Sequence, residues 1–123
     1  MYLNHGDLEM LILNVIWDNA ETLNSSMSVN QVWDKLNRLN SKKKWAYTTI
    51  KTVLDRLVEK GLLNKIKNGK KYDYVALASR NEMAEKALKK VAFEYFSSDF
   101  LKMADLVKDL AYEEEKNLVH VYR

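Results

Sequence analysis

Apolar side chains recur at every third or fourth position along much of the chain, which is the spacing of one face of an α-helix. This pattern predicts helices over residues 7–18, 28–39, 46–60, 81–97 and 100–117. In the first three of these helices the predicted buried faces are Leu8, Leu11, Ile12, Val15 and Ile16; Val29, Val32, Trp33 and Leu36; and Ile50, Val53, Leu54, Leu57 and Val58. The chain is therefore expected to be mainly α-helical.

Short motifs mark the boundaries of the predicted helices. Residues 19–27 are mostly small and polar and are expected to form a loop. Ser28-Val29-Asn30-Gln31 has the Ser-x-x-Gln pattern of a capping box, in which two side chains satisfy two backbone amides at a helix start. Gly61 is a natural end for the third helix.

A β-hairpin is predicted after the third helix. Asn68-Gly69 separates two strand-like runs, residues 62–67 and 70–77, and Asn-Gly favours a type I′ turn with both residues at positive φ. Lysines surround this turn and are expected to form a basic tip: Lys65, Lys67, Lys70 and Lys71.

Three helices followed by a two-stranded β-ribbon is the order of a winged helix-turn-helix. In that fold the third helix is narrow enough to enter the major groove of DNA, where base edges present a distinct pattern of donors and acceptors. We therefore expect a winged-helix DNA-binding domain over residues 1–80. Residues 81–117 are too amphipathic to stand alone, and residues 81–123 are expected to form a helical dimerisation region.

Composition excludes several other kinds of protein. The 123 residues include no Cys, no Pro and only 3 Gly, which rules out disulfides and thiolate chemistry and disfavours an all-β fold. The two histidines, His5 and His120, lie near opposite ends of the sequence. No nucleophile–base pair, metal cluster or phosphate-binding loop is recognisable, so we expect no catalytic residues, no metal and no cofactor.

Charge is concentrated in one part of the chain. The net charge is only +3, but residues 34–71 hold 12 Lys and Arg against 3 Asp and Glu, a local charge of +9. Such a segment is typical of a module that binds a polyanion. No apolar run approaches the ~18 residues of a membrane span, and no secretory signal is evident, so a cytoplasmic protein is expected.

The third helix carries the most specific signal. Trp45 to Leu63 reads WAYTTIKTVLDRLVEKGLL, which resembles the recognition-helix signature of the penicillinase and methicillin-resistance repressor family, the BlaI/MecI/CopY type. Further agreement is seen in Val15-Ile16-Trp17 of the first helix and in the wing segment 68–74. The resemblance implies a transcriptional repressor that binds a roughly palindromic double-stranded operator as a homodimer.

The resemblance also implies which residues face DNA. Thr48, Thr49, Lys51 and Thr52 occupy the positions where the family places DNA-facing residues. Other candidates follow from charge and position, for contacts to the DNA backbone: Tyr47, Lys43, Lys44, Ser28, Asn30, Lys67, Lys70 and Lys71. Two alternatives stay open, namely that Tyr47 covers the second helix and that Ser28 only caps it.

The C-terminal helices carry more large apolar residues than one small domain needs. The expected dimerisation residues are Leu88, Val91, Phe93, Phe96, Phe100, Leu101, Leu106 and Leu110. A dimer core is the preferred interpretation of this set, and a core within one chain is the alternative.

The resemblance has limits that concern regulation. Copper-responsive members of the family carry a C-terminal cysteine cluster, which this chain lacks. Antibiotic-responsive members are inactivated by proteolysis at an Asn-Phe bond, whereas Asp109-Leu110 stands at the roughly aligned position, so an inactivating protease or sensor is an open prediction. A second hypothesis for the whole protein is a winged helix that binds other proteins and not DNA.

Overall fold

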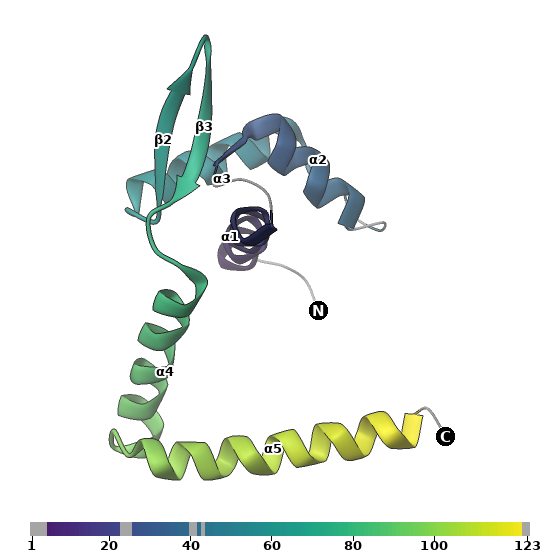
Figure 1. Cartoon of the computed structure of the whole chain (residues 1–123), viewed down its shortest axis with the longest axis vertical. Coiled ribbons are helices and arrows are strands. Elements are labelled where there is room, and N and C mark those ends of the chain that lie inside the picture. The colour runs from purple at the N-terminus through teal and green to yellow at the C-terminus, as the bar shows by residue number, and fades with distance from the viewer. Residues whose placement is uncertain (1–4, 23–25, 40–41, 43, 122–123) are drawn as a thin grey trace. The chain divides into compact units, whose positions relative to one another are not determined.

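The computed structural model describes residues 5–22, 26–39, 42 and 44–121. The elements are α1 (His5–Thr22), β1 (Ser26–Ser28), α2 (Val29–Leu39), α3 (Tyr47–Glu59), β2 (Leu63–Asn68), β3 (Lys71–Ala76), α4 (Arg80–Phe96) and α5 (Phe100–Val121) (Figure 1). The chain divides into two compact units, residues 1–80 and 81–123, each of which is described by itself.

The first unit is built around a core between α1, α2 and α3. Ile12, Ile16, Val32, Ile50 and Leu54 have no exposed surface, and all five lie on the faces that the helical spacing predicts. The burial departs from the predicted faces in both directions, and Leu11 and Val58 are only half-buried. Leu13 and Trp17 are buried on α1 beyond the predicted stripe, and Trp33 of α2 stays 36% exposed at the edge of the core.

The sheet has three strands, one more than the predicted two-stranded ribbon. Ser26–Ser28, expected to lie mostly in a loop, forms β1 and pairs antiparallel with β3, which gives the strand order β1-β3-β2. Met27 of β1 is buried opposite the fully buried Tyr74. A three-residue strand is too short to show an alternating pattern, so only its long-range pairing with β3 reveals it.

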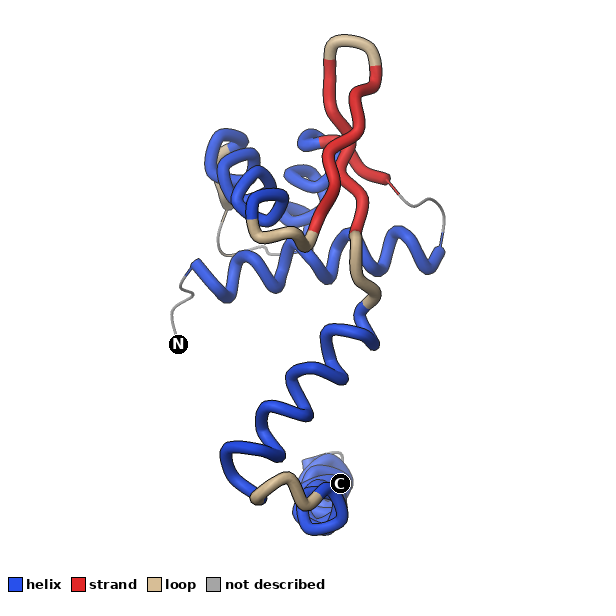
Figure 2. The backbone as a smooth tube through the Cα atoms, turned by 90° about the vertical axis from the view of Figure 1, so that its left-hand side faces the viewer, coloured by secondary structure: helices blue, strands red, loops and turns tan. Residues whose placement is uncertain are grey.

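The wing hairpin forms as predicted, but its turn does not. Asn68 pairs with Lys71 as the last ladder pair, so Gly69 and Lys70 are the two turn residues. Among the described residues of this turn only Gly69 has positive φ (66°), which is the pattern of a type II′ turn with Gly at its first central position. Asn68 is the last residue of β2, and its side-chain amide donates to Asp73 at 3.1 Å. Figure 2 shows this hairpin projecting beyond the helices.

Ion pairs help to hold α1 in the first unit. Glu9 is only 9% exposed and accepts two hydrogen bonds from the Lys60 ammonium, at 2.8 and 2.9 Å, which joins α1 to the end of α3. Arg80 forms ion pairs with Asp18 at 2.6 Å and with Glu21 at 2.8 Å. The core is thus bounded by charged side chains whose partners are supplied from distant parts of the sequence.

The second unit consists of two helices and a tight turn between them. Ser97 and Ser98 both adopt left-handed backbone conformations, with φ of 50° and 62°, and the Ser98 amide donates to the Ala92 carbonyl. Asp99 then caps α5 by accepting a hydrogen bond from the Lys102 amide at 3.1 Å. In the part of the chain that the structure describes, no helix combines the length and the apolar character needed to cross a membrane.

The core predicts a clear difference between two leucine substitutions. Leu54→Ala should lower the free energy of unfolding by about 2–5 kcal/mol, because it leaves a cavity in a fully buried site. Leu39→Ala is the control, since Leu39 is 66% exposed and should change stability by only about 0.5 kcal/mol. Urea unfolding of both variants measures this, and equal losses would contradict the described core.

Candidate nucleic-acid interface

The start of α3 is fixed by hydrogen bonds to the side chain of Asn37 on α2. The Trp45 amide donates to Asn37 Oδ1 at 2.9 Å, and Asn37 Nδ2 donates to the Trp45 carbonyl at 3.2 Å. Trp33 Nε1 donates to the same carbonyl at 2.8 Å, and the Lys44 ammonium donates to the Asn37 carbonyl. The backbone just before α3 is therefore pinned to α2, which orients the helix.

One face of α3 is buried and the opposite face is exposed. Ile50, Val53, Leu54 and Leu57 form the buried face. The four candidate base-reading residues Thr48, Thr49, Lys51 and Thr52 are all exposed. The Thr52 hydroxyl donates to the Thr48 carbonyl at 2.8 Å, so Thr52 presents chiefly its methyl group to solvent.

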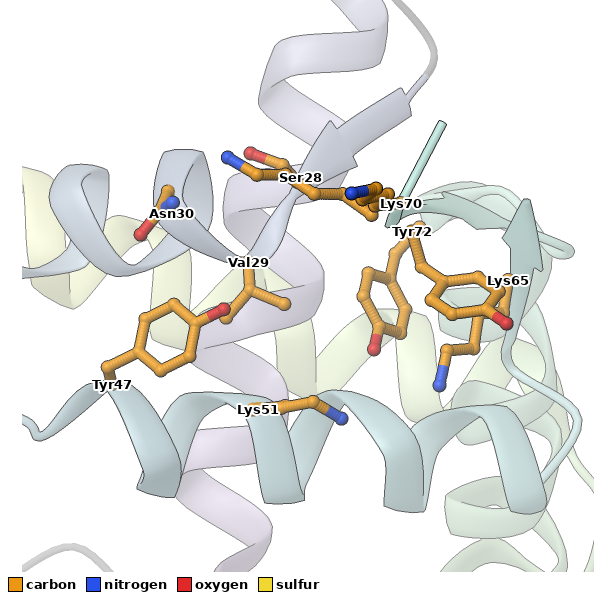
Figure 3. A pocket seen from close by; sticks show the side chains of 10 residues that line it. Ser28, Val29, Asn30, Tyr47, Lys51, Lys65, Lys70 and Tyr72 are labelled. Atoms are coloured by element: carbon orange, nitrogen blue, oxygen red, sulfur yellow. The ribbon is translucent and has the colours of Figure 1, made fainter. Parts of the chain in front are cut away.

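An open cavity of about 300 Å³ lies between the start of α2, α3 and the wing (Figure 3). Its lining residues are Ser28, Val29, Asn30, Tyr47, Lys51, Lys65, Lys70, Lys71, Tyr72 and Tyr74. Four of them are lysines and none is acidic. This arrangement attracts anions, and its tyrosines supply flat surfaces and hydroxyl groups beside the positive charge.

The cavity brings together only part of the predicted set. Ser28, Asn30, Tyr47, Lys51, Lys70 and Lys71 line it, whereas Thr48, Thr49, Thr52, Lys44 and Lys67 are not among its lining residues. Lys43 lies outside the described residues. Most of the predicted residues that are described therefore lie on the exposed face of α3 or line the cavity, whereas Lys44 lies before α3 and Lys67 lies on β2.

Two alternatives left open by the sequence have structural answers. Ser28 and Gln31 form the predicted capping box, with the Ser28 amide donating to Gln31 Oε1 at 2.8 Å and the Gln31 amide donating to Ser28 Oγ at 3.2 Å. The Tyr47 ring packs edge-on against Trp33 with ring centroids 5.9 Å apart, so it covers α2, and it also lines the cavity. Each residue thus has a structural role beside any role in binding.

Asp55 does not line the cavity, but it contacts three residues that do and so joins α3 to the wing. Its Oδ2 accepts from the Lys51 ammonium at 2.8 Å, and its Oδ1 accepts from the Tyr74 hydroxyl at 2.6 Å and the Lys65 ammonium at 3.2 Å. Burial acts to raise the pKa of Asp55, but the hydrogen bonds from these three partners outweigh it, and the net pKa is lowered. Burial, reinforced by the bond to Asp55, raises the pKa of Tyr74.

Lys65 does not belong to the basic tip of the wing, contrary to the sequence prediction. It lies directly across from Tyr74 in the β2–β3 ladder, and its ammonium sits 4.5 Å from the centre of the Tyr72 ring. Figure 3 shows Lys65 reaching from the wing toward α3, while Lys51 extends along α3 toward the wing. The i,i+4 spacing of Lys51 and Asp55 was a sequence signal for one contact, but nothing local indicated that Lys65 and Tyr74 join it.

The second surface with functional potential is apolar. Seven of the eight predicted dimerisation residues are exposed in the single chain, with Phe93 at 74% and Leu101 at 80%, and Phe96 is half-buried. Tyr95, Val107 and Tyr112, which were not in the predicted set, are exposed beside them. Only Ala92 and Met103 are buried among the described side chains of this unit, so it has almost no core of its own.

No group of three or more His, Cys, Asp or Glu side chains within the described ranges is arranged to hold a metal ion. Polar side chains gather instead at the cationic cavity and around Asp55.

Comparisons with known proteins agree with this geometry. The profile of the family described as penicillinase repressor matches residues 5–121. The chain is 32% identical over 78 residues to a transcriptional regulator BlaI of Mycobacterium tuberculosis, covering 63% of this chain and 51% of the regulator. It is 25% identical over 119 residues to the methicillin resistance regulatory protein MecI of Staphylococcus aureus, covering 91% and 89%.

A solved structure is similar to the first unit. The solution structure of the DNA-binding domain of the repressor BlaI has 32% sequence identity and a TM-score of 0.50, and the match covers 62% of this chain and 83% of that domain. The chain spans about half the length of the mycobacterial regulators that it matches.

The lowered pKa of Asp55 gives a pH prediction. Because the folded pKa lies below the ordinary value of 3.8, the ionised carboxylate stabilises the folded protein above that pH, and this contribution is lost as the pH falls through the folded pKa. Asp55→Asn should therefore be less stable than the wild type at pH 7, and the difference should shrink below pH 3.8. Urea unfolding from pH 7 downward measures it.

The matched control is Asp34→Asn, which makes the same change in charge and breaks the exposed ion pair with Arg38. Its effect on stability should be small at every pH, because surface pairs contribute little. A difference for Asp55→Asn that stays constant with pH would contradict the assigned role of the carboxylate.

Proposed function

The chain belongs to the penicillinase repressor family, and from this premise we propose that it is a transcriptional repressor that binds double-stranded DNA. The observation that carries the proposal is the joining of the exposed face of α3 to a cavity that four lysines line. The proposal is supported by the similarity of the chain to a transcriptional regulator BlaI, to a regulatory protein MecI and to the DNA-binding domain of the repressor BlaI. Such a protein acts where the DNA lies, which is the cytoplasm of a bacterium.

In this proposal α3 enters the major groove and reads base edges. Lys51 donates to the acceptors of guanine, and the Thr52 methyl, left outward by the bond from its hydroxyl to Thr48, contacts a thymine methyl. Thr48 and Thr49 stand at the start of the helix, where hydroxyl groups reach either bases or phosphates. The sequence preference of the protein would come from these four side chains.

The cavity and the wing would hold the sugar–phosphate backbone on either side of that groove. Lys70 and Lys71 supply charge from the wing, with Lys67 beside them, and Lys44 lies just before α3. At the start of α2 the capping box occupies the amides of Ser28 and Gln31, so a phosphate would meet the amides of residues 29 and 30. These contacts give affinity that falls with salt and carry no sequence information.

Dimerisation through α4 and α5 completes the proposal. The apolar side chains of these helices are exposed in the single chain, and a unit with so little core gains stability by burying them against a second copy. A two-fold dimer places two recognition helices in major grooves ~34 Å apart, and the operator is then roughly palindromic. Repression follows because the bound dimer occludes a promoter.

A protease or sensor that relieves repression stays a prediction from the family resemblance. Asp109 and Leu110 lie within α5 and are exposed. Peptide bonds inside a helix must be unfolded locally before a protease can cut them. Cleavage at this position would therefore require opening of α5.

Lys51→Ala and Lys70→Ala should separate base reading from backbone binding. Duplexes selected by the wild-type chain from a random pool, and shuffled duplexes of the same composition, serve as probes. Lys51→Ala should weaken binding to the selected duplex by about 1–3 kcal/mol and reduce the preference over shuffled DNA. Lys70→Ala should weaken both alike and lower the salt slope by about 1. Fluorescence anisotropy at several salt concentrations measures these affinities.

Two outcomes would contradict the proposal. If the wild-type chain binds no duplex at low salt, the chain does not bind DNA. That result would favour the alternative of a winged helix that binds other proteins. If Lys51→Ala leaves both affinities unchanged, the assigned base reader is wrong.

The dimer is tested by Leu101→Ser combined with Phe93→Ser. Removing two exposed apolar side chains from each partner should raise the dissociation constant of the dimer by at least about tenfold, from the loss of buried apolar area. Leu77→Ser, at a leucine that is 58% exposed in the first unit, is the control and should leave it unchanged. Sedimentation equilibrium measures the constants, and a monomeric wild type would refute the dimer.

A further inference from the structure

Lys51, the lysine within α3, is already paired before any nucleic acid arrives. Its ammonium lies 2.8 Å from Asp55 Oδ2, and the bond to Asp55 raises the pKa of Lys51. An ammonium group has three N–H donors. One is used on Asp55, and two are left to donate to other acceptors. The ammonium group of the candidate base reader is thus already paired with a carboxylate.

The same carboxylate also holds the wing. Tyr74 on β3 has no exposed surface, and its hydroxyl donates to Asp55 Oδ1. Lys65, its cross-strand neighbour on β2, forms an ion pair with that oxygen atom at 3.2 Å. Both strands of the wing are therefore linked to α3 through one side chain that lies four residues after Lys51.

The two lysines at the wing tip, Lys70 and Lys71, differ from Lys51 and Lys65 in their ion pairing. Lys70 and Lys71 line the cavity and are exposed, and neither forms an ion pair with another described residue. The cavity therefore contains two kinds of lysine. Lys51 and Lys65 share one carboxylate, whereas the two tip lysines carry uncompensated charge.

We propose that Asp55 is a specificity-determining positioning residue, which holds Lys51 for directional hydrogen bonding to base edges and keeps Lys51 and Lys65 from acting as free charges toward phosphates. This inference rests on the proposed DNA-binding function. A lysine that is free to move reaches the phosphates of any sequence, so it strengthens binding to all DNA alike. A lysine held in one position contributes only where a base presents an acceptor there. Asp55 thus lowers non-specific affinity and preserves the preference for one sequence.

The test is Asp55→Asn, which removes the charge but keeps an oxygen that can accept from the Tyr74 hydroxyl. Anisotropy titrations use the duplex selected by the wild-type chain and a shuffled duplex, each over a range of salt concentrations. The variant should bind shuffled DNA several-fold more tightly, and its salt slope should be steeper by about 1–2, since two lysines become available to phosphates. The ratio of selected to shuffled affinity should fall by about tenfold.

Two comparisons separate this role from a merely structural one. Asp34→Asn makes the same change in charge and releases Arg38 from an i,i+4 ion pair outside the cavity, and it should leave the affinity ratio unchanged. The second comparison is a double-mutant cycle, which measures the coupling between Lys51 and Asp55. If Asp55 acts through Lys51, then in a Lys51→Gln background Asp55→Asn should lower the ratio of selected to shuffled affinity by less than half of its effect in the wild type.

Asp55→Glu gives a second variant in case Asp55→Asn does not fold, which thermal melting followed by circular dichroism would reveal. Glutamate keeps the charge, so the salt slope should stay at its wild-type value. A slope as steep in Asp55→Glu as that expected for Asp55→Asn would overturn the inference. An unchanged affinity ratio in Asp55→Asn, or an equal loss in the Lys51→Gln background, would also overturn it.

The failure of this inference is distinguishable from the failure of the proposed function. If the wild-type chain prefers its selected duplex and Asp55→Asn keeps that preference, the chain is a DNA-binding protein and Asp55 is not its specificity determinant. If the wild-type chain binds neither duplex, the proposed function and this inference both fail.

Discussion

The burial of one face of α3 is the constraint on which the rest of the first unit depends. Ile50, Val53 and Leu54 are sealed against the neighbouring helices, so the opposite face of α3 must point outward. Exposure of the threonines and Lys51 is thus a consequence of the core, since a helix has fixed angular spacing. Asn37 then fixes the backbone at Trp45, where α3 begins, and the helix has one orientation in which to meet a ligand.

Asp55 links α3 to the sheet through polar contacts, as the core links α3 to the other helices through apolar ones. It projects from the boundary between the buried and exposed faces of α3 and accepts hydrogen bonds from Lys51 on its own helix and from Tyr74 on the sheet. A partly buried carboxylate needs such partners, because an unpaired charge there would be costly. The need to satisfy one carboxylate therefore links the helix that would read bases to the wing that would bind phosphates.

The second unit shows the opposite arrangement. Its helices bury little within one chain, and large apolar side chains such as Phe93 and Leu101 remain in water. Such a surface is unfavourable for an isolated helix pair, and association relieves it. The two units thus differ in what they expose. The first has a complete core and exposes charged side chains, and the second has almost no core and exposes apolar side chains.

The sequence by itself determined the helices, the wing hairpin, the capping box at Ser28 and the outward face of α3. All of these follow from interactions between residues close together in the chain, which local spacing records. Only the tertiary structure decided the third strand, the turn at Gly69 and Lys70, and the place of Lys65 behind the cavity and not at the wing tip. The third strand depends on β3, which is distant in sequence, and the place of Lys65 depends on Asp55 of another element. The turn depends on the register in which Asn68 pairs with Lys71. No local pattern specifies which of these groups will meet.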